Sequence, residues 1–270
     1  MAAARSSLHG MRPAWTDFRR RLKAREHLLG TFIKTPTTHA TEILGTLGFD
    51  FVVIDQEHSP FDRVTIDTMV LGARAANIAG IVRVGDPGDA NILSVLDCGA
   101  AGVLVPHVDS AEKARAIAAA CRYRGGRRGF ANTTRAGGFG EVSFADHMAA
   151  QDAQVTCVAM IEDLAAIDAI DAIAAVEGID AFFVGRGDLT AAIGAPSMTS
   201  PETHRLVEPI MAAARKAGMP VIMLSPDRKD AVAMARLGAT AFMFSSDQGM
   251  LKQAARQALN EFAPPIEGTK

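Results

Sequence analysis

Cysteine and aromatic residues are scarce in this sequence of 270 residues, which has three cysteines, one tryptophan and one tyrosine. Cys98, Cys121 and Cys157 lie far apart and show no CxxC spacing, which disfavours a disulfide framework or a cysteine-based zinc site. We interpret them as small core residues of a protein in a reducing compartment, and we expect a cytoplasmic location.

Neither sign of charge is in excess, because 28 lysines and arginines stand against 30 aspartates and glutamates, for a net charge of −2. Binding to nucleic-acid phosphates needs a clear surplus of positive charge, so we expect no nucleic-acid partner. The sequence also lacks an uncharged apolar run of about 18 residues and an apolar segment at its N-terminus, so neither membrane insertion nor secretion is expected. The one basic run, residues 19–25, is interpreted as the solvated face of a helix.

The sequence does contain eight short β-branched or aromatic runs, separated by alanine-rich segments with helical spacing. The expected strands are at 30–34, 51–54, 81–84, 102–105, 155–161, 181–184, 220–224 and 240–244. The expected helices include 38–47, 62–76, 110–121, 164–175, 202–217 and 227–236. Glycines stand where helix C-caps are expected, at Gly48, Gly178, Gly218 and Gly238.

Alternation of eight strands with helices predicts an α/β fold in which a parallel sheet closes into a (β/α)8 TIM barrel. Apolar residues make up 49% of the chain, which suffices for one large core. We therefore expect residues 1–270 to form a single barrel domain with a short helical extension over about residues 1–28. An open doubly wound sheet is the alternative, and it is disfavoured because no GxGxxG follows the first strand.

Residues 122–140 break this alternation. The segment is rich in glycine and arginine and has little apolar periodicity, so it predicts a long loop after the fourth strand and its helix. Such a loop is either a disordered surface excursion or a lid or binding loop. In the second case its arginines would suit an anionic substrate.

Ionisable residues stand at the ends of four expected strands. His58 follows the second strand, Arg83 lies at the end of the third, Glu162 follows the fifth and Asp188 follows the sixth. Because the C-terminal ends of barrel strands share one face, we expect these four side chains to meet in one pocket.

Each of these residues also has a simpler interpretation. His58 could be a structural hydrogen-bonding residue, and Glu162 and Asp188 could each cap a helix. Arg83 is harder to explain in this way, because a buried guanidinium group must find an anion. Together, Glu162 and Asp188 form the pair of hard oxygen ligands expected for Mg²⁺ or Mn²⁺, with water and substrate completing the shell. Zinc is less favoured, since no histidine or cysteine pair stands at ligand spacing.

Five motifs occur in order: GFDFVVIDQEHSPFD, IVRVGDPG, LDCGAAGVLVPHVDSAEKA, AMIE and DAFFVGRGDLT. They resemble the successive motifs of the HpcH/HpaI family of metal-dependent class II aldolases that use pyruvate as donor. The resemblance runs from about Gly30 to past Gly194. It implies a barrel of the phosphoenolpyruvate/pyruvate superfamily type that cleaves 4-hydroxy-2-oxo acids reversibly to pyruvate, or a related 2-oxo acid, and an aldehyde. A divalent cation (Mg²⁺, Mn²⁺ or Co²⁺) and a homotrimer or homohexamer are implied as well.

The resemblance also implies roles for single residues. His58 corresponds to the general base, Arg83 to the residue that binds the pyruvate keto oxygen, and Glu162 with Asp188 to the metal ligands. The backbone of Gly187 and Asp188 corresponds to the segment that hydrogen-bonds the pyruvate carboxylate. In such a site the metal and the guanidinium group stabilise the enolate oxygen while the histidine moves the proton.

Other positions carry expectations of their own. Asp97 matches an aspartate that reaches the active site of the neighbouring subunit. Arg186 departs from a common proline of the family, and His107 stands at a variable position and could touch substrate. Asp55 or Glu57 is expected to hold His58.

Two rival functions remain: an acyl-CoA lyase related to the citrate lyase β subunit, and a non-catalytic binding protein. Lys34 is the lysine at a strand end that could form a Schiff base. The C-terminal helical segment has apolar residues that need a surface to cover, either on its own barrel or on a partner: Leu251, Ala255, Leu259 and Phe262.

Overall fold

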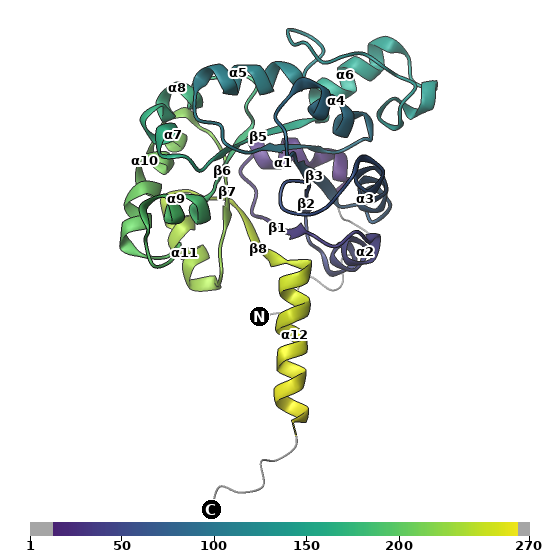
Figure 1. Ribbon diagram of the computed structural model, residues 1–270. Coiled ribbons are helices and arrows are strands. Elements are labelled where there is room, and N and C mark those ends of the chain that lie inside the picture. Colours follow the sequence, from purple (N-terminus) through teal and green to yellow (C-terminus); the bar gives the residue numbers. More distant parts are fainter. Residues whose placement is uncertain (1–12, 264–270) are drawn as a thin grey trace, which may run out of the picture.

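The computed structural model describes residues 13–263, and its eight strands form a closed barrel in sequence order. Each strand pairs in parallel with the next, and β8 closes on β1. Figure 1 shows helices around the outside of the barrel. The predicted (β/α)8 fold is confirmed. Of the predicted N-terminal extension, residues 1–12 lie outside the described part of the chain, as does Lys270.

The strands match the predicted ranges to within about two residues. They are β1 (Leu28–Ile33), β2 (Phe51–Asp55), β3 (Ala79–Arg83), β4 (Gly102–Val105), β5 (Thr156–Ile161), β6 (Ala181–Val184), β7 (Val221–Leu224) and β8 (Ala241–Ser246). Their side chains are almost all buried, because the inward faces fill the barrel and the outward faces pack under the helices.

The helices include two that the sequence pattern did not predict, α4 and α6, and a third, α9, that was considered only as a helix that Asp188 might cap. The full set of described helices is α1 (Phe18–Lys23), α2 (Thr38–Leu47), α3 (Arg63–Ala75), α4 (Asp89–Asp97), α5 (Ala111–Ala120), α6 (Phe144–Gln154), α7 (Leu164–Asp168), α8 (Ile170–Ala174), α9 (Arg186–Ile193), α10 (Pro201–Ala217), α11 (Arg228–Leu237) and α12 (Asp247–Phe262), with 3₁₀ helices η1 (Trp15–Asp17) and η2 (Arg135–Gly140). Gly48, Gly218 and Gly238 cap helices in the left-handed conformation. Gly178 does not, because α8 already ends at Ala174 and its C-cap is Ala175.

The N-terminal end of the barrel is closed by α1. Phe18 and Leu22 are buried against the barrel interior, and the rings of Phe18 and Phe51 lie 5.2 Å apart. Arg19 and Arg21 form ion pairs with carboxylates at this end of the barrel, so the basic run is only partly the solvated face that we expected. The other end of the barrel is therefore the accessible one.

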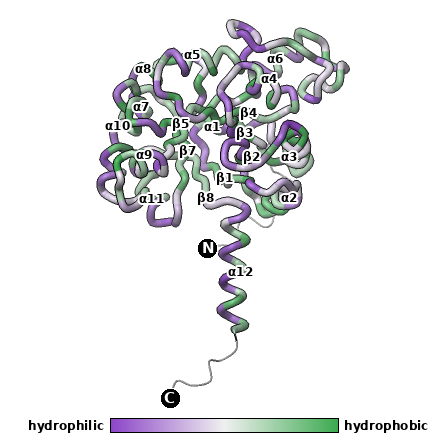
Figure 2. Tube along the Cα trace, in the orientation of Figure 1, coloured by the Kyte–Doolittle hydropathy of each residue, from purple (hydrophilic) through white to green (hydrophobic). Residues whose placement is uncertain are grey.

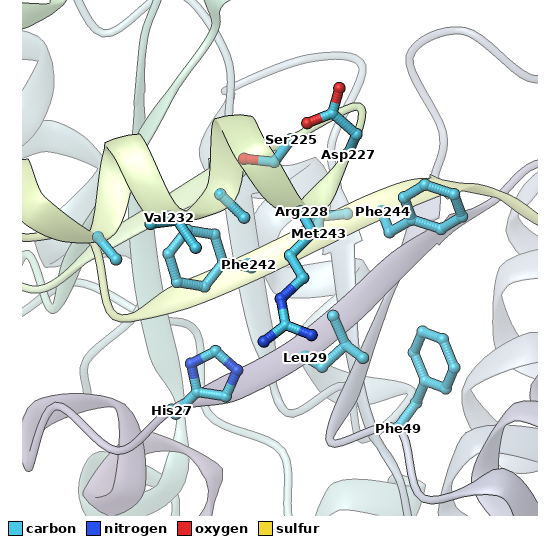
Figure 3. Close-up of a pocket in the computed structure, with 12 residues that line it drawn as sticks. His27, Leu29, Phe49, Ser225, Asp227, Arg228, Val232, Phe242, Met243 and Phe244 are labelled. Carbon is cyan, nitrogen blue, oxygen red and sulfur yellow. The ribbon is translucent and has the colours of Figure 1, made fainter. Parts of the chain in front are cut away.

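Helix α12 projects away from the barrel (Figure 1). Along its length apolar and polar positions alternate (Figure 2), and Leu251, Leu259 and Phe262 are 72%, 72% and 85% exposed. The helix after β8 would complete the outer ring of a closed barrel. That place is instead an apolar groove of about 490 Å³ over β8, β1 and α11 (Figure 3). The alternative that this helix covers its own barrel is therefore wrong.

The arginine-rich segment 122–140 stands out from the side of the barrel with η2 and α6 (Figure 1). Four of its five arginines, all except Arg124, form ion pairs with carboxylates of the same chain, as in the pairs Arg122–Asp180 at 2.8 Å and Arg135–Asp67 at 2.7 Å. None of these residues, all of which are described, lines the cavity at the open end of the barrel.

The three cysteines are buried and free, as their interpretation as core residues requires. Within residues 13–263, no helix combines the length and the apolar character needed to cross a membrane.

Candidate active site

The C-terminal ends of the strands enclose a cavity of about 340 Å³. Of the four residues predicted to meet, His58, Arg83 and Asp188 line this cavity, and Glu162 lies beside Asp188. The barrel topology brings the four together from β2, β3, β5 and β6, as expected for residues at strand ends.

Arg83 is buried and bound by two carboxylates. The register of β2 and β3 sets Asp55 directly beside Arg83, and the guanidinium Nε and Nη2 donate to the two oxygens of Asp55 at 2.9 and 2.8 Å. Nη1 lies 3.2 Å from Glu57 Oε2, and the guanidinium lies over the ring of Phe32 at 4.8 Å. These contacts hold the planar guanidinium group in one orientation at the cavity wall.

Asp55 is the most enclosed carboxylate of the site, with a fully buried side chain. Burial alone would raise its pKa, but the hydrogen bonds and charge of Arg83, the backbone N–H of His58 and the amine of Lys34 lower the pKa of Asp55 below its usual value. Lys34 Nζ lies 3.2 Å from Asp55 Oδ2. Asp55 therefore stays ionised and holds both cations.

His58 is half exposed at the cavity, and its nearest carboxylate is Glu57, with Nε2 to Oε2 at 3.8 Å. Of the two carboxylates expected to hold this imidazole, Asp55 contacts only the backbone N–H of His58. Glu57 thus lies between Arg83 and His58 and contacts both.

Glu162 is buried, and its pKa is raised to about 7. Burial is the main cause, and the neighbouring carboxylate of Asp188 adds to it, while the backbone N–H of His107, 2.8 Å from Oε1, acts in the opposite direction. Gly185 leaves the space that Glu162 occupies, because a Cβ at Gly185 would lie 2.8 Å from Glu162 Oε2. Two carboxylates close together, one of them buried, form a place that favours a cation.

His107 packs around this carboxylate. The backbone of His107 has a φ of 55°, which is unusual for a residue with a Cβ. In this conformation the backbone N–H of His107 donates to Glu162. The imidazole Nδ1 lies 3.1 Å from Asp163 Oδ2 and 3.5 Å from Glu162 Oε1. Burial lowers the pKa of His107, but the hydrogen bond to Asp163 and the charges of Glu162 and Asp163 raise it overall.

Helix α9 begins at the cavity, with Gly187 and Asp188 in its first turn. The first N–H groups of a helix have no acceptor within the helix, so they are suited to an anion. Arg186 lies in the wall of the cavity but is bound by Asp230, at 2.8 and 2.6 Å. Its role is to tie α9 to α11.

Comparison with known proteins shows to which family the chain belongs. The family described as HpcH/HpaI aldolase/citrate lyase matches residues 28–254. The chain belongs to this family. A 5-keto-4-deoxy-D-glucarate aldolase of Klebsiella pneumoniae subsp. pneumoniae is 34% identical over 247 residues, which are 91% of this chain and 96% of that protein. Identity at this level over most of both chains makes the protein a carbon–carbon lyase of the aldolase type.

Solved structures of the HpcH/HpaI aldolase/citrate lyase family agree with the fold. A family protein from Burkholderia cenocepacia J2315 has a TM-score of 0.86 and 28% identity, and the match covers 92% of this chain and 100% of the Burkholderia chain. The citrate synthase SbnG has a TM-score of 0.81 and 30% identity, with 90% of this chain and 96% of that chain covered.

Asp97, another predicted site residue, lies away from the cavity of its own chain. It ends α4 and lies 3.3 Å from Arg128 in the 122–140 segment. Burial raises the pKa of Asp97, although the charge of Arg128 opposes this. The expectation that Asp97 acts in a neighbouring subunit remains a proposal.

Sequence reasoning missed parts of the site. Ser245 and Ser246 at the end of β8 line the cavity, and no chemical motif marks them. The contact of Lys34 with Asp55 and that of His107 with Glu162 were missed too. Both could have been sought by placing every polar residue after a strand on the same face of the barrel.

Proposed function

We propose that this enzyme is a metal-dependent class II aldolase that cleaves 4-hydroxy-2-oxo acids reversibly to pyruvate, or a related 2-oxo acid, and an aldehyde. The observation that carries the proposal is the position of the buried carboxylate of Glu162 beside Asp188, which lines the same cavity as Arg83 and His58. The 34% identity to a 5-keto-4-deoxy-D-glucarate aldolase supports it.

The residues fit a divalent metal ion. Glu162 and Asp188 offer only hard oxygen atoms, and the repulsion between the buried carboxylate of Glu162 and that of Asp188 is relieved when a cation lies between them. In residues 13–263, no three His, Cys, Asp or Glu side chains are grouped to hold a metal, so water and substrate would supply the remaining ligands. Mg²⁺, Mn²⁺ and Co²⁺ suit such a set. Bound there, the ion would polarise the keto group of the substrate.

The protein's own residues would perform the remaining steps. The first-turn N–H groups of Gly187 and Asp188 bind the substrate carboxylate, and Arg83 donates to the keto oxygen. His58 takes the proton of the C4 hydroxyl, directly or through a water molecule. The C3–C4 bond then breaks, its electron pair forms the enolate of pyruvate, and the aldehyde leaves. Protonation of the enolate at C3 completes pyruvate.

An acyl-CoA lyase is the second candidate, since the family description includes citrate lyase and SbnG is a citrate synthase of 30% identity. The two functions differ in product. We expect release of pyruvate from 4-hydroxy-2-oxo acids, followed with a coupled dehydrogenase, to require Mg²⁺, Mn²⁺ or Co²⁺ and to stop on chelation. Turnover of a CoA thioester without any 2-oxo acid cleavage, or full activity in excess chelator, would refute the aldolase.

We further propose that the enzyme is a homo-oligomer in which α12 of one chain lies in the groove of another. The apolar stripe of α12 is exposed while the groove that the eighth helix should fill is open (Figure 3). If two chains exchange their α12 helices, they form a pair. A hexamer contains three such pairs, and it also contains two trimers, in which Asp97 would reach the active site of a neighbouring chain. We also propose that the whole chain is one domain and, because its cysteines are free, that it is cytoplasmic.

A further inference from the structure

The cavity contains a second cation besides Arg83, the ammonium group of Lys34. Lys34 directly follows β1, and its side chain lines the cavity near Ser245 and Ser246 of β8. The side chain is 28% exposed, so it is partly covered by the protein while still reaching the cavity.

Arg83 and Lys34 differ in how far their donors are used. Three of the five N–H donors of Arg83 point to Asp55 and Glu57. Lys34 Nζ has one polar contact among the described residues, with Asp55 Oδ2, and Arg83 Nη2 already binds this oxygen at 2.8 Å. An ammonium group has three donors, which leaves two for a molecule in the cavity.

The backbone around Lys34 is held in place by the first turn of α12. The N–H groups of Lys34 and Thr35 donate to the two carboxylate oxygens of Asp247 at 2.9 and 3.0 Å, and Gln248 Nε2 donates to the carbonyl of Lys34 at 3.2 Å. A cation whose attachment point is fixed loses less conformational entropy when it binds an anion.

The balance of charge in the cavity depends on Lys34. Asp55 and Glu57 carry two negative charges, which Arg83 and Lys34 together offset, and a divalent ion would offset Glu162 and Asp188. Loss of Lys34 would remove one positive charge from the cavity and make it less attractive to an anionic substrate. Arg83 by itself already binds both oxygens of Asp55, so Asp55 does not need Lys34 for its hydrogen bonds.

We infer that Lys34 determines substrate specificity by binding a carboxylate on the aldehyde half of the substrate. The inference rests on the proposed aldolase function, in which Arg83 and the first turn of α9 take the 2-oxo acid half. Lys34, at the end of β1 beside Ser245 and Ser246, faces the space left for the other half.

The test compares two 4-hydroxy-2-oxo acids of equal length, one ending in a carboxylate and the other in a methyl group. The measured quantity is the ratio of their kcat/KM values in the parent enzyme, in Lys34→Met and in Lys34→Arg. Lys34→Met keeps the length of the stem and removes the charge. We expect this ratio to fall about 10- to 100-fold in Lys34→Met, the range for a lost hydrogen bond to a charged group, and to be largely kept in Lys34→Arg.

Lys216→Met is the matched control, because Lys216 is 76% exposed and pairs with Asp171 on the surface; its ratio should equal that of the parent. An equal loss for both substrates in Lys34→Met, with no change in the ratio, would overturn the inference and make Lys34 a counter-ion of Asp55. Absence of cleavage of either substrate, and of pyruvate methyl-proton exchange, in the parent enzyme would instead refute the proposed function.

Discussion

Glu162→Gln should stabilise the metal-free protein, and the gain should grow with pH. Glu162 is buried beside Asp188, and its pKa is raised from 4.5 to about 7. A raised carboxyl pKa means that the fold prefers the protonated form, so this group destabilises the fold progressively as pH rises from about 4.5 to about 7. Glutamine is neutral at every pH and keeps the oxygen that accepts from the N–H of His107.

The size of the effect follows from the shift in pKa. One unit corresponds to about 1.4 kcal/mol, so the variant should gain up to about 3 kcal/mol in the free energy of unfolding above pH 7 and almost nothing below pH 4.5. Urea unfolding of parent and variant in chelator at about pH 5 and pH 8, at one protein concentration, measures the difference.

Divalent metal supplies the control for this prediction. Saturating Mg²⁺ or Mn²⁺ should restore stability to the parent at pH 8, by about 2.7 kcal/mol when the ion is at 100 times its Kd, but should do little for the variant. A difference between parent and variant that is the same at both pH values would refute the reasoning, because a packing change does not depend on pH.

Three further predictions concern the chemistry and the assembly. His58→Ala should slow exchange of pyruvate methyl protons with deuterated solvent by about 100-fold or more, the range for a positioned general base; exchange at the parent rate, measured by NMR, would exclude His58 from this role. Treatment with pyruvate and borohydride should leave the protein mass unchanged, because an enolate stabilised by metal and Arg83 needs no Schiff base; a pyruvyl adduct on Lys34 would contradict the proposal. The double variant Leu251→Glu, Leu259→Glu should have a lower molar mass in light scattering, because both side chains are 72% exposed on α12 and are proposed to enter a partner's groove. The control Gln253→Glu, on the opposite face of α12, should leave the molar mass unchanged. An unchanged molar mass for the double variant would rule out the exchange.

The strands were predictable because a strand buried on both faces is a short continuous apolar run, and FVVI at 51–54 and AFFV at 181–184 are such runs. Helix α9 was considered only as a helix that Asp188 might cap, and its start at Arg186 was missed because its eight residues, RGDLTAAI, include a glycine in the first turn. Helix α6 was missed because it follows directly on the glycine-rich segment 122–140. Short helices are stabilised by packing rather than by their own pattern, so the sequence signals them weakly.

The site was predictable only at the level of which residues meet. Barrel topology alone brings His58, Arg83 and Asp188 to one end. Which charges pair depends on strand register, as where β2 and β3 set Asp55 beside Arg83. It also depends on loop conformation, as at His107 with its φ of 55°. Neither can be read from spacing along the chain.

The closure of the barrel by Phe18 and Leu22 has a kinetic consequence. Because side chains fill the barrel interior and α1 covers its base, the cavity opens at the C-terminal end of the strands, and both products of a cleavage leave by the route by which the substrate entered. If Arg83 and the first turn of α9 hold the 2-oxo acid half while the aldehyde half lies nearer the opening, the aldehyde has to depart before the pyruvate. Turnover would then follow an ordered sequence, in which pyruvate is the last molecule out and the first one in when the reaction runs backwards.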